Sequence, residues 1–243
     1  VISELEKKLL FHYSSLANYY GEGLINKTKA AIFFIQIEEL NLLQNLRLAE
    51  QQQEWRYAQA ILTILGKVYR LLGRKSEFKS LRKRALNQVG TLLEEAKGKG
   101  RDTFNFWMYL RSEDANEAID IPDWESAKAI YQKILKELIE LNDESFNGNV
   151  AVAYNQLASI AHQQRQLAQS EYYLEEALKI YEDSKDLHQV AINNHNLGIL
   201  AREQRQYEKA KKYFLKSQKI REGAGNFYEG ASDYYQLGIL AQE

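Results

Sequence analysis

The sequence of 243 residues contains no cysteine and only one proline, Pro122. A chain without cysteine forms no disulfide, no thiolate zinc site and no cysteine nucleophile. Folds made of strands and turns usually need several prolines in their turns. This chain is instead rich in Leu, Ala, Glu, Lys and Gln, which favour helices. The sequence therefore predicts an all-α fold.

Long apolar runs and export signals are also absent. No apolar stretch approaches the roughly 18 residues that a membrane-spanning helix needs. No positively charged start followed by an apolar segment indicates a secretory signal. The net charge of −1 points to neither nucleic acid nor a membrane surface as a partner. We therefore expect a cytoplasmic protein without a membrane partner.

The C-terminal part of the chain, residues 151–243, repeats itself. The segment YNQLA at 154–158 returns as NHNLG at 194–198 and as YYQLG at 234–238. The central leucine of each copy recurs at a constant spacing, at positions 157, 197 and 237. A constant period of this length predicts an array of stacked structural repeats.

A second phrase of large and small residues lies between the copies of the first. Small residues let two antiparallel helices approach closely, and large apolar residues fill the grooves beside them. Each unit is therefore predicted to be a helical hairpin that buries its apolar face only by stacking on its neighbours. The phrase comprises Leu167, Ser170, Leu174 and Ala177 in one copy and Tyr207, Ala210, Phe214 and Ser217 in the next.

These residues resemble the tetratricopeptide repeat family. Its signature of Leu-Gly, a small residue, an aromatic residue and a final small residue is matched by Leu197, Gly198, Ala210, Phe214 and Ser217. The family's usual unit has about 34 residues and a proline near its end. The longer spacing in this chain and the missing proline imply longer helices. The resemblance implies an all-α, right-handed superhelical array of antiparallel helix hairpins.

The chain is expected to have two parts, an N-terminal helical segment at 1–54 and a repeat array at 55–243. Because the last copy lacks a second helix and the chain starts without Met, we expect a fragment of a longer protein, with a natural capping helix as the alternative. The expected units lie near 55–96, 104–142, 151–189 and 191–229, followed by a truncated unit at 231–243.

Local composition predicts several interruptions between helices. In the N-terminal segment we expect a helix over 1–20, a break at 21–23 (Gly-Glu-Gly) and a second helix over 28–51. The glycine-rich residues 97–100 are expected to be an exposed linker. The polar, acidic stretch 112–123 predicts a loop, and 142–149 predicts another joint.

A second pattern runs through the N-terminal segment and ends at the first tryptophan. Its members are His12, Tyr13, Leu16, Ala17, Glu38, Asn41, Leu42, Leu46 and Trp55. The pattern is similar to the start of the helical arm of STAND-type signalling NTPases, which include bacterial maltose-regulator-like transcription factors. In that class a nucleotide-binding core precedes the arm. The resemblance implies a sensor arm that contacts an NTPase or effector domain outside this sequence.

No set of residues in the sequence predicts catalysis. A phosphate-binding loop needs G-x-x-x-x-G-K-[ST] after a strand, and residues 21–28 have neither the spacing nor the strand. The four histidines, His12, His162, His188 and His195, lack the spacing of a metal site. Neighbouring glutamates face different directions on a helix. We therefore predict that the chain is not an enzyme and binds no cofactor or metal ion.

Positive charge is concentrated between residues 67 and 101, where eleven Lys and Arg accompany three Glu. A basic helix can contact phosphates or an acidic protein surface. No nucleic-acid motif accompanies it, so a solvated or intramolecular role is favoured over an acidic partner, and nucleic acid is the least favoured. The centre of this basic patch comprises Arg74, Lys75, Lys79, Arg82, Lys83 and Arg84.

The outward-facing positions of the first helices are the remaining candidate surface. In tetratricopeptide proteins these positions line the concave groove, where Asn and Gln hydrogen-bond an extended peptide. Solvated helix faces are the alternative at every position. Only Asn196 matches the family's clamp for chaperone C-termini, so that ligand is not expected. The groove positions are Asn155, Ser159, His162, Gln163, His195, Asn196, Ile199, Arg202, Glu203 and Tyr235, with Ile239 beside them.

The sequence thus predicts a non-catalytic scaffold that binds a protein or peptide. We expect it to be the ligand-sensing or autoinhibitory arm of a larger bacterial signalling protein. Two alternatives stay open: a free-standing regulator resembling bacterial peptide-pheromone receptors, and a structural assembly adaptor without a small ligand.

Overall fold

The structure is a computed structural model that describes residues 4–25, 29–96 and 100–242, with only the backbone described at 20–25 and 91–96. Every regular element in these ranges is a helix, which confirms the all-α prediction. The helices are α1 (Glu4–Ile25), α2 (Lys29–Ile37), α3 (Glu39–Gln51), α4 (Trp55–Leu71), α5 (Lys75–Ala96), α6 (Arg101–Asp120), α7 (Trp124–Leu141), the 3-10 turn η1 (Glu144–Phe146), α8 (Asn147–Gln163), α9 (Leu167–Asp183), α10 (Leu187–Glu203), α11 (Tyr207–Gly223) and α12 (Phe227–Leu240).

The helices form two compact units, Val1–Glu113 and Asp114–Glu243, and the division between them falls within α6. The expected boundary at 54/55 lies inside the first unit, between α3 and α4. The division into a helical segment at 1–54 and an array at 55–243 stays a prediction.

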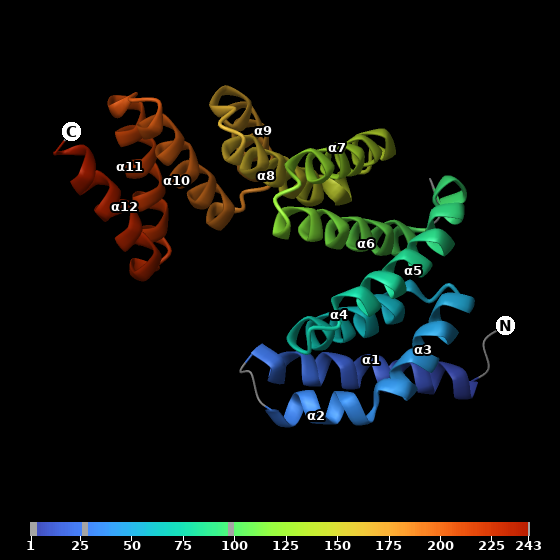
Figure 1. The fold of residues 1–243 in the computed structure, drawn as a ribbon. Helices are drawn as coiled ribbons and strands as arrows, with labels where there is room; N and C mark the ends of the chain where they lie inside the picture. The colour runs from blue at the N-terminus through green and yellow to red at the C-terminus, as the bar shows by residue number, and fades with distance from the viewer. Residues whose placement is uncertain (1–3, 26–28, 97–99, 243) are drawn as a thin grey trace. The chain divides into compact units, whose positions relative to one another are not determined.

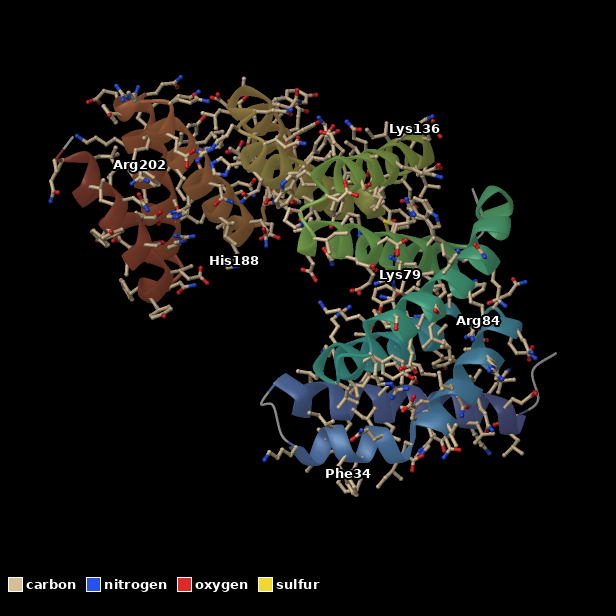
Figure 2. All side chains as sticks on the ribbon, in the orientation of Figure 1. Phe34, Lys79, Arg84, Lys136, His188 and Arg202 are labelled. Carbon is tan, nitrogen blue, oxygen red and sulfur yellow. The ribbon has the colours of Figure 1, made fainter. Side chains whose placement is uncertain are left out.

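The first unit is built around α4. This helix packs against α1, α3 and α5, and its face of Ile61, Leu62 and Leu65 is fully buried. At its N-terminal end Trp55 stacks on Phe106 of α6, with ring centroids 5.2 Å apart. On α2, Phe34 lies on the side away from α1 and is exposed (Figure 2).

Three predictions about where helices continue or break differ from the structure. The helix expected to break at 21–23 continues to Ile25, because packing against α3 and α4 offsets the roughly 1 kcal/mol that each helical glycine costs. The single helix expected over 28–51 is divided at Glu38 into α2 and α3. The loop expected at 112–123 is wrong, since α6 extends to Asp120 and buries Ala115 and Ala118.

Other predicted joints are partly described. The linker expected at 97–100 lies outside the described residues except for Gly100. The joint expected at 142–149 is shorter, because Asn142 ends α7 in the left-handed conformation and α8 already begins at Asn147.

The second unit stacks its helices in chain order, each packing against the next from α7 to α12 (Figure 1). The helices α8 to α11 each have 17 residues. One residue with positive φ lies in each connecting turn, at the evenly spaced positions Arg165, Lys185, Arg205 and Gly225. The period of the leucines is therefore two helix-plus-turn segments of equal length. The helices α8 and α10 begin upstream of the starts expected at 151 and 191.

The Leu-Gly phrase has a packing role. A Cβ placed on Gly198 would lie 2.6 Å from the ring of Phe214, so only glycine lets α10 and α11 approach this closely. In the first unit, a Cβ on Gly66 would lie 2.5 Å from Phe78. Both glycines therefore accept a phenylalanine ring from the partner helix of their hairpin.

Candidate functional site

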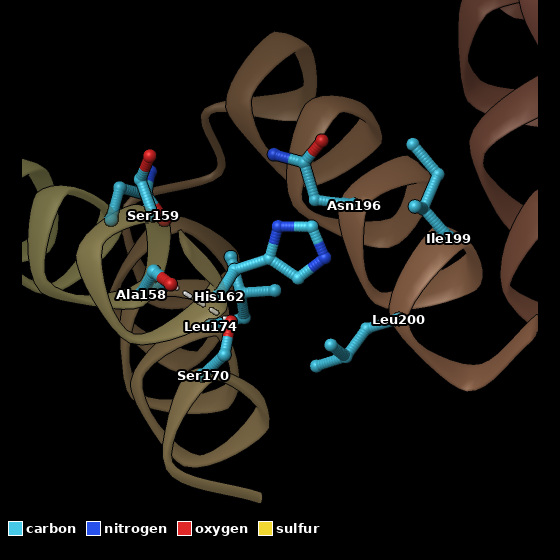
Figure 3. A pocket seen from close by; sticks show the side chains of 9 residues that line it. Ala158, Ser159, His162, Ser170, Leu174, Asn196, Ile199 and Leu200 are labelled. Atoms are coloured by element: carbon cyan, nitrogen blue, oxygen red, sulfur yellow. Dashed lines mark hydrogen bonds between the residues drawn. The ribbon is translucent and has the colours of Figure 1, made fainter. Parts of the chain in front are cut away.

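The predicted groove positions on α8 and α10 meet at a cavity of about 200 Å³. It lies where these two first helices face each other above α9 (Figure 3). The helix α9 supplies Ser170 and Leu174 to its wall, and Ala158 and Leu200 complete its apolar part. The predicted positions that line it are Asn155, Ser159, His162, Asn196 and Ile199.

The wall on the α9 side is held by a buried hydrogen bond. The hydroxyl of Ser170 donates to the carbonyl oxygen of Ala158 at 2.9 Å, so the small residue of the second phrase fastens α9 to α8. Next to it, Leu174 contributes an aliphatic surface and is almost completely buried. The α9 side of the cavity wall is therefore fixed within one hairpin.

His162 forms a bridge across the cavity. It projects from α8 toward α10 (Figure 3), and its Nε2 lies 2.9 Å from a carboxylate oxygen of Glu203. Arg165 Nη1 lies 3.6 Å from the same carboxylate. Glu203, a predicted groove residue, thus lies outside the cavity lining and links two successive repeats.

Asn155 contributes an unusual polar group. Its side chain hydrogen-bonds the hydroxyl of Tyr181, and this contact partly opposes the burial that raises the pKa of Tyr181. Its carbonyl oxygen Oδ1 is buried and accepts no hydrogen bond from the residues that the structure describes. A buried acceptor without a donor is costly, and because water does not reach this oxygen, a ligand in the cavity does not reach it either.

The other predicted groove residues lie elsewhere. Gln163 and Tyr235 are exposed. Arg202 Nη1 donates to Gln236 Oε1 at 2.9 Å, which links α10 to α12. The side chain of His195 is only 15% exposed and points into a buried cluster with Asp233. The assignment of the ten positions to one binding groove stays a prediction.

Sequence reasoning missed this buried cluster between α10, α11 and α12. The carboxylate of Asp233 is fully buried and accepts hydrogen bonds from Ser217 Oγ at 2.9 Å and from Arg221 Nη1 at 2.9 Å. Its other oxygen lies 2.6 Å from His195 Nδ1. The available signal was the spacing of Ser217 and Arg221, which lie one turn apart on the face of α11 that packs in the array.

The basic patch is largely paired within the first unit. Arg74 donates to Glu39 and Glu77 and lies over the ring of Tyr69. This arginine lowers the pKa of Glu39. Arg84 hydrogen-bonds Glu50 at 2.9 Å. These contacts favour the intramolecular role.

Arg82 and Lys79 of the basic patch are also relevant to its intramolecular role. Arg82, which is almost completely buried, lies 3.7 Å from Glu113 and over the ring of Phe78. Lys79 lies on the exposed side of α5 (Figure 2). A charge-based partner for this helix stays a prediction.

Across the described ranges, no group of three His, Asp or Glu side chains converges to hold a metal ion. Of the helices described, none combines the length and apolar character required to cross a bilayer.

Comparison with known proteins identifies a family over part of the chain. Residues 149–223 match the model of the tetratricopeptide repeat family. The matched segment contains α9, α10, α11 and most of α8, and therefore the whole cavity. No curated protein sequence matches this chain.

Two solved structures are similar to the chain. The crystal structure of BtubC (BKLC) from P. vanneervenii aligns with a TM-score of 0.57 and 16% identity, covering 99% of this chain and 89% of the other. The apo form of RapI aligns with a TM-score of 0.55 and 15% identity, covering 98% and 71%. At such identities the likeness concerns the fold alone.

Proposed function

Because residues 149–223 match the tetratricopeptide repeat family, we propose that this chain is a non-catalytic scaffold that binds a protein or peptide on the first helices of its repeats. The supporting observation is the cavity between α8 and α10, which gathers Asn155, Ser159, His162, Asn196 and Ile199. Residues from two successive copies of the repeat thus form one surface suited to an extended chain.

The proposed mechanism depends on contacts between neighbouring repeats. A ligand bound between α8 and α10 changes how strongly these two helices are held together. It either displaces the contact between His162 and Glu203 or adds contacts of its own. It thereby favours one relative position of the two helices over another, which is how a ligand shifts a conformational equilibrium. In a sensor arm, this change alters the contact with a signalling domain.

The binding role is tested with a displayed library of random peptides and the full chain as bait. The groove variant carries Asn155→Ala, Asn196→Ala and Arg202→Ala. The control variant replaces three exposed lysines on α11 by alanine: Lys211, Lys212 and Lys219. We expect the wild type and the control to select peptides and the groove variant to lose them. Equal selection by all three folded proteins would contradict the proposal.

The role as a sensor arm has its own test. The complete coding sequence is expected to encode a phosphate-binding loop between a strand and a helix upstream of the repeats. A complete reading frame that encodes only the repeats would remove the sensor-arm proposal but leave peptide binding untouched, as in a free-standing regulator.

An assembly adaptor is the second candidate, and exposed aromatic residues on α12 favour it. Phe227 is 70% exposed, Tyr228 92% and Tyr235 68%. Aromatic side chains are enriched in protein–protein interfaces. If peptide selection fails, replacing these three residues by serine should reduce binding of a purified partner protein, and unchanged binding would count against this role.

A further inference from the structure

The size and lining of the cavity between α8 and α10 indicate which part of a peptide binds there. This inference rests on the proposed function. The volume of the cavity, about 200 Å³, is smaller than the roughly 300–1,000 Å³ of sites that hold whole small molecules. A cavity of about 150 Å³ lined by apolar side chains is enough for one benzene ring. The space therefore suits a single side chain and not a complete ligand.

The residues around the cavity carry no fixed charge. Its lining contains no Asp, Glu, Lys or Arg, and His162 is its only titratable residue. The nearby charge of Glu203 is already engaged by His162 and Arg165. Burying a charged side chain without an opposite charge is strongly unfavourable. The cavity therefore does not suit Asp, Glu, Lys or Arg of a ligand.

The floor of the cavity is apolar. Leu174, Leu200 and Ala158 are buried, and Ile199 is half-buried beside them. In Figure 3, Leu174 and Leu200 lie on the same side of the His162 ring. An apolar side chain of a ligand that packs here is transferred from water to an aliphatic surface. This removal of apolar surface from water is the main source of affinity for such groups.

Polar groups line the cavity beside its apolar floor. The lining also holds the carboxamides of Asn155 and Asn196 and the hydroxyl of Ser159. A carboxamide both donates and accepts, so it matches the N–H and C=O of a peptide backbone. Asn196 is exposed, so its carboxamide is the one that a peptide backbone can reach. The apolar floor and this carboxamide together suit one apolar residue within an extended chain.

We propose that the cavity between α8 and α10 is a specificity pocket for one apolar side chain, Leu, Ile, Met or Phe, of an extended peptide whose backbone is hydrogen-bonded by Asn196. Neighbouring peptide residues contact the exposed helix surfaces and contribute little selectivity. The peptide sequence is thus read mainly at this single position.

The test uses the random peptide library with the full chain and two serine variants. Ser159→Leu fills the cavity from an exposed position of α8, so the fold should be retained. Ser184→Leu makes the same change on an exposed residue outside the cavity. Affinities of the selected peptides are then measured by fluorescence anisotropy, with circular dichroism as the check on folding.

We expect wild-type selections to show one position dominated by Leu, Ile, Met or Phe. Alanine at that position should weaken binding about 10- to 100-fold, as expected for one fully buried apolar side chain. Ser159→Leu should weaken binding of the parent peptide to a similar extent, and Ser184→Leu should not change it. A third variant, Ile199→Ala, should shift selection toward larger side chains.

The outcomes separate this inference from the proposed function. Peptides selected without a dominant apolar position, or bound equally by Ser159→Leu, would overturn the specificity pocket while peptide binding stands. A wild-type chain that selects no peptide would overturn both.

Discussion

The buried carboxylate of Asp233 lies 2.6 Å from Nδ1 of His195, a residue 38 positions earlier in the chain. The same carboxylate accepts a hydrogen bond from Arg221 Nη1 at 2.9 Å. Asp233 is fully buried, and the side chain of Arg221 is 8% exposed. These contacts fasten α12 to both helices of the preceding repeat.

Removing Asp233 should destabilise the second unit strongly. In Asp233→Ala the buried cation of Arg221 loses its nearest carboxylate and keeps only Glu229, 3.9 Å from its Nε. Breaking a buried ion pair costs about 3–5 kcal/mol. Urea unfolding followed by circular dichroism measures the loss. The double variant Asp233→Leu with Arg221→Met removes both charges and should be less destabilised. A loss below about 1 kcal/mol for the single variant would contradict this role.

Gly198 and Gly238 occupy equivalent positions in successive repeats but should respond differently to alanine. In Gly198→Ala the new Cβ meets the buried ring of Phe214, and overpacking of this kind costs about 1–3 kcal/mol. At Gly238, beyond the residue's own helix backbone and chain neighbours, nothing lies within 4 Å of the corresponding Cβ position. There, alanine should be neutral or stabilise by up to about 1 kcal/mol.

Adding Phe214→Leu to Gly198→Ala tests the proposed cause. If the clash with the ring is responsible, the two substitutions together should cost less than the sum of their separate effects. Additive losses in urea unfolding would assign the effect of Gly198→Ala to something other than this contact.

Tyr109 should make the first unit sensitive to alkali. Burial raises the pKa of Tyr109 to about 12, against an ordinary value of about 10. The unfolded chain therefore ionises first, so this contribution to stability is complete below pH 10 and is lost as the pH rises toward 12. Each pH unit between the two pKa values corresponds to about 1.4 kcal/mol.

Tyr109→Phe should flatten the decline of the unfolding free energy between pH 10 and 12, measured by urea unfolding. Part of the decline should stay, because burial also raises the pKa of Tyr69. The exposed Tyr235→Phe is the control. Identical pH profiles for Tyr109→Phe and wild type would contradict the prediction.

Lys185 and Arg205 adopt positive φ values of 57° and 59° in tight turns between helices. The left-handed conformation costs an ordinary residue about 1–2 kcal/mol, whereas glycine adopts it freely. Lys185→Gly and Arg205→Gly should therefore stabilise the second unit by about 0.5–1 kcal/mol each. Gly225→Ala, at a φ of 73°, should destabilise it by about 1 kcal/mol. A thermal melt of the three variants checks the opposite signs.

The amino-acid sequence alone was sufficient for the repeat architecture. The recurrence of leucine at 157, 197 and 237 reports a packing pattern that every copy shares, and such a pattern is local and periodic. The cavity between α8 and α10 was also foreseeable in part, because Asn155, Ser159, Asn196 and Ile199 lie on the first helices of neighbouring copies. The breaks between helices were harder to predict from the sequence. The acidic stretch that continues α6 has the composition of a loop, and it is helical because Ala115 and Ala118 are buried.

Only the tertiary structure decided what the non-repeating polar residues do. His195 had the sequence position of a groove residue, but Asp233 from α12 draws its side chain into a buried cluster. Arg74 and Arg84 had the composition of a charged surface, yet carboxylates of α3 and α5 pair with them. The sequence determined which faces are apolar and therefore how the repeats stack. The partners of each charge depend on residues distant in the chain, so folding alone brings them together.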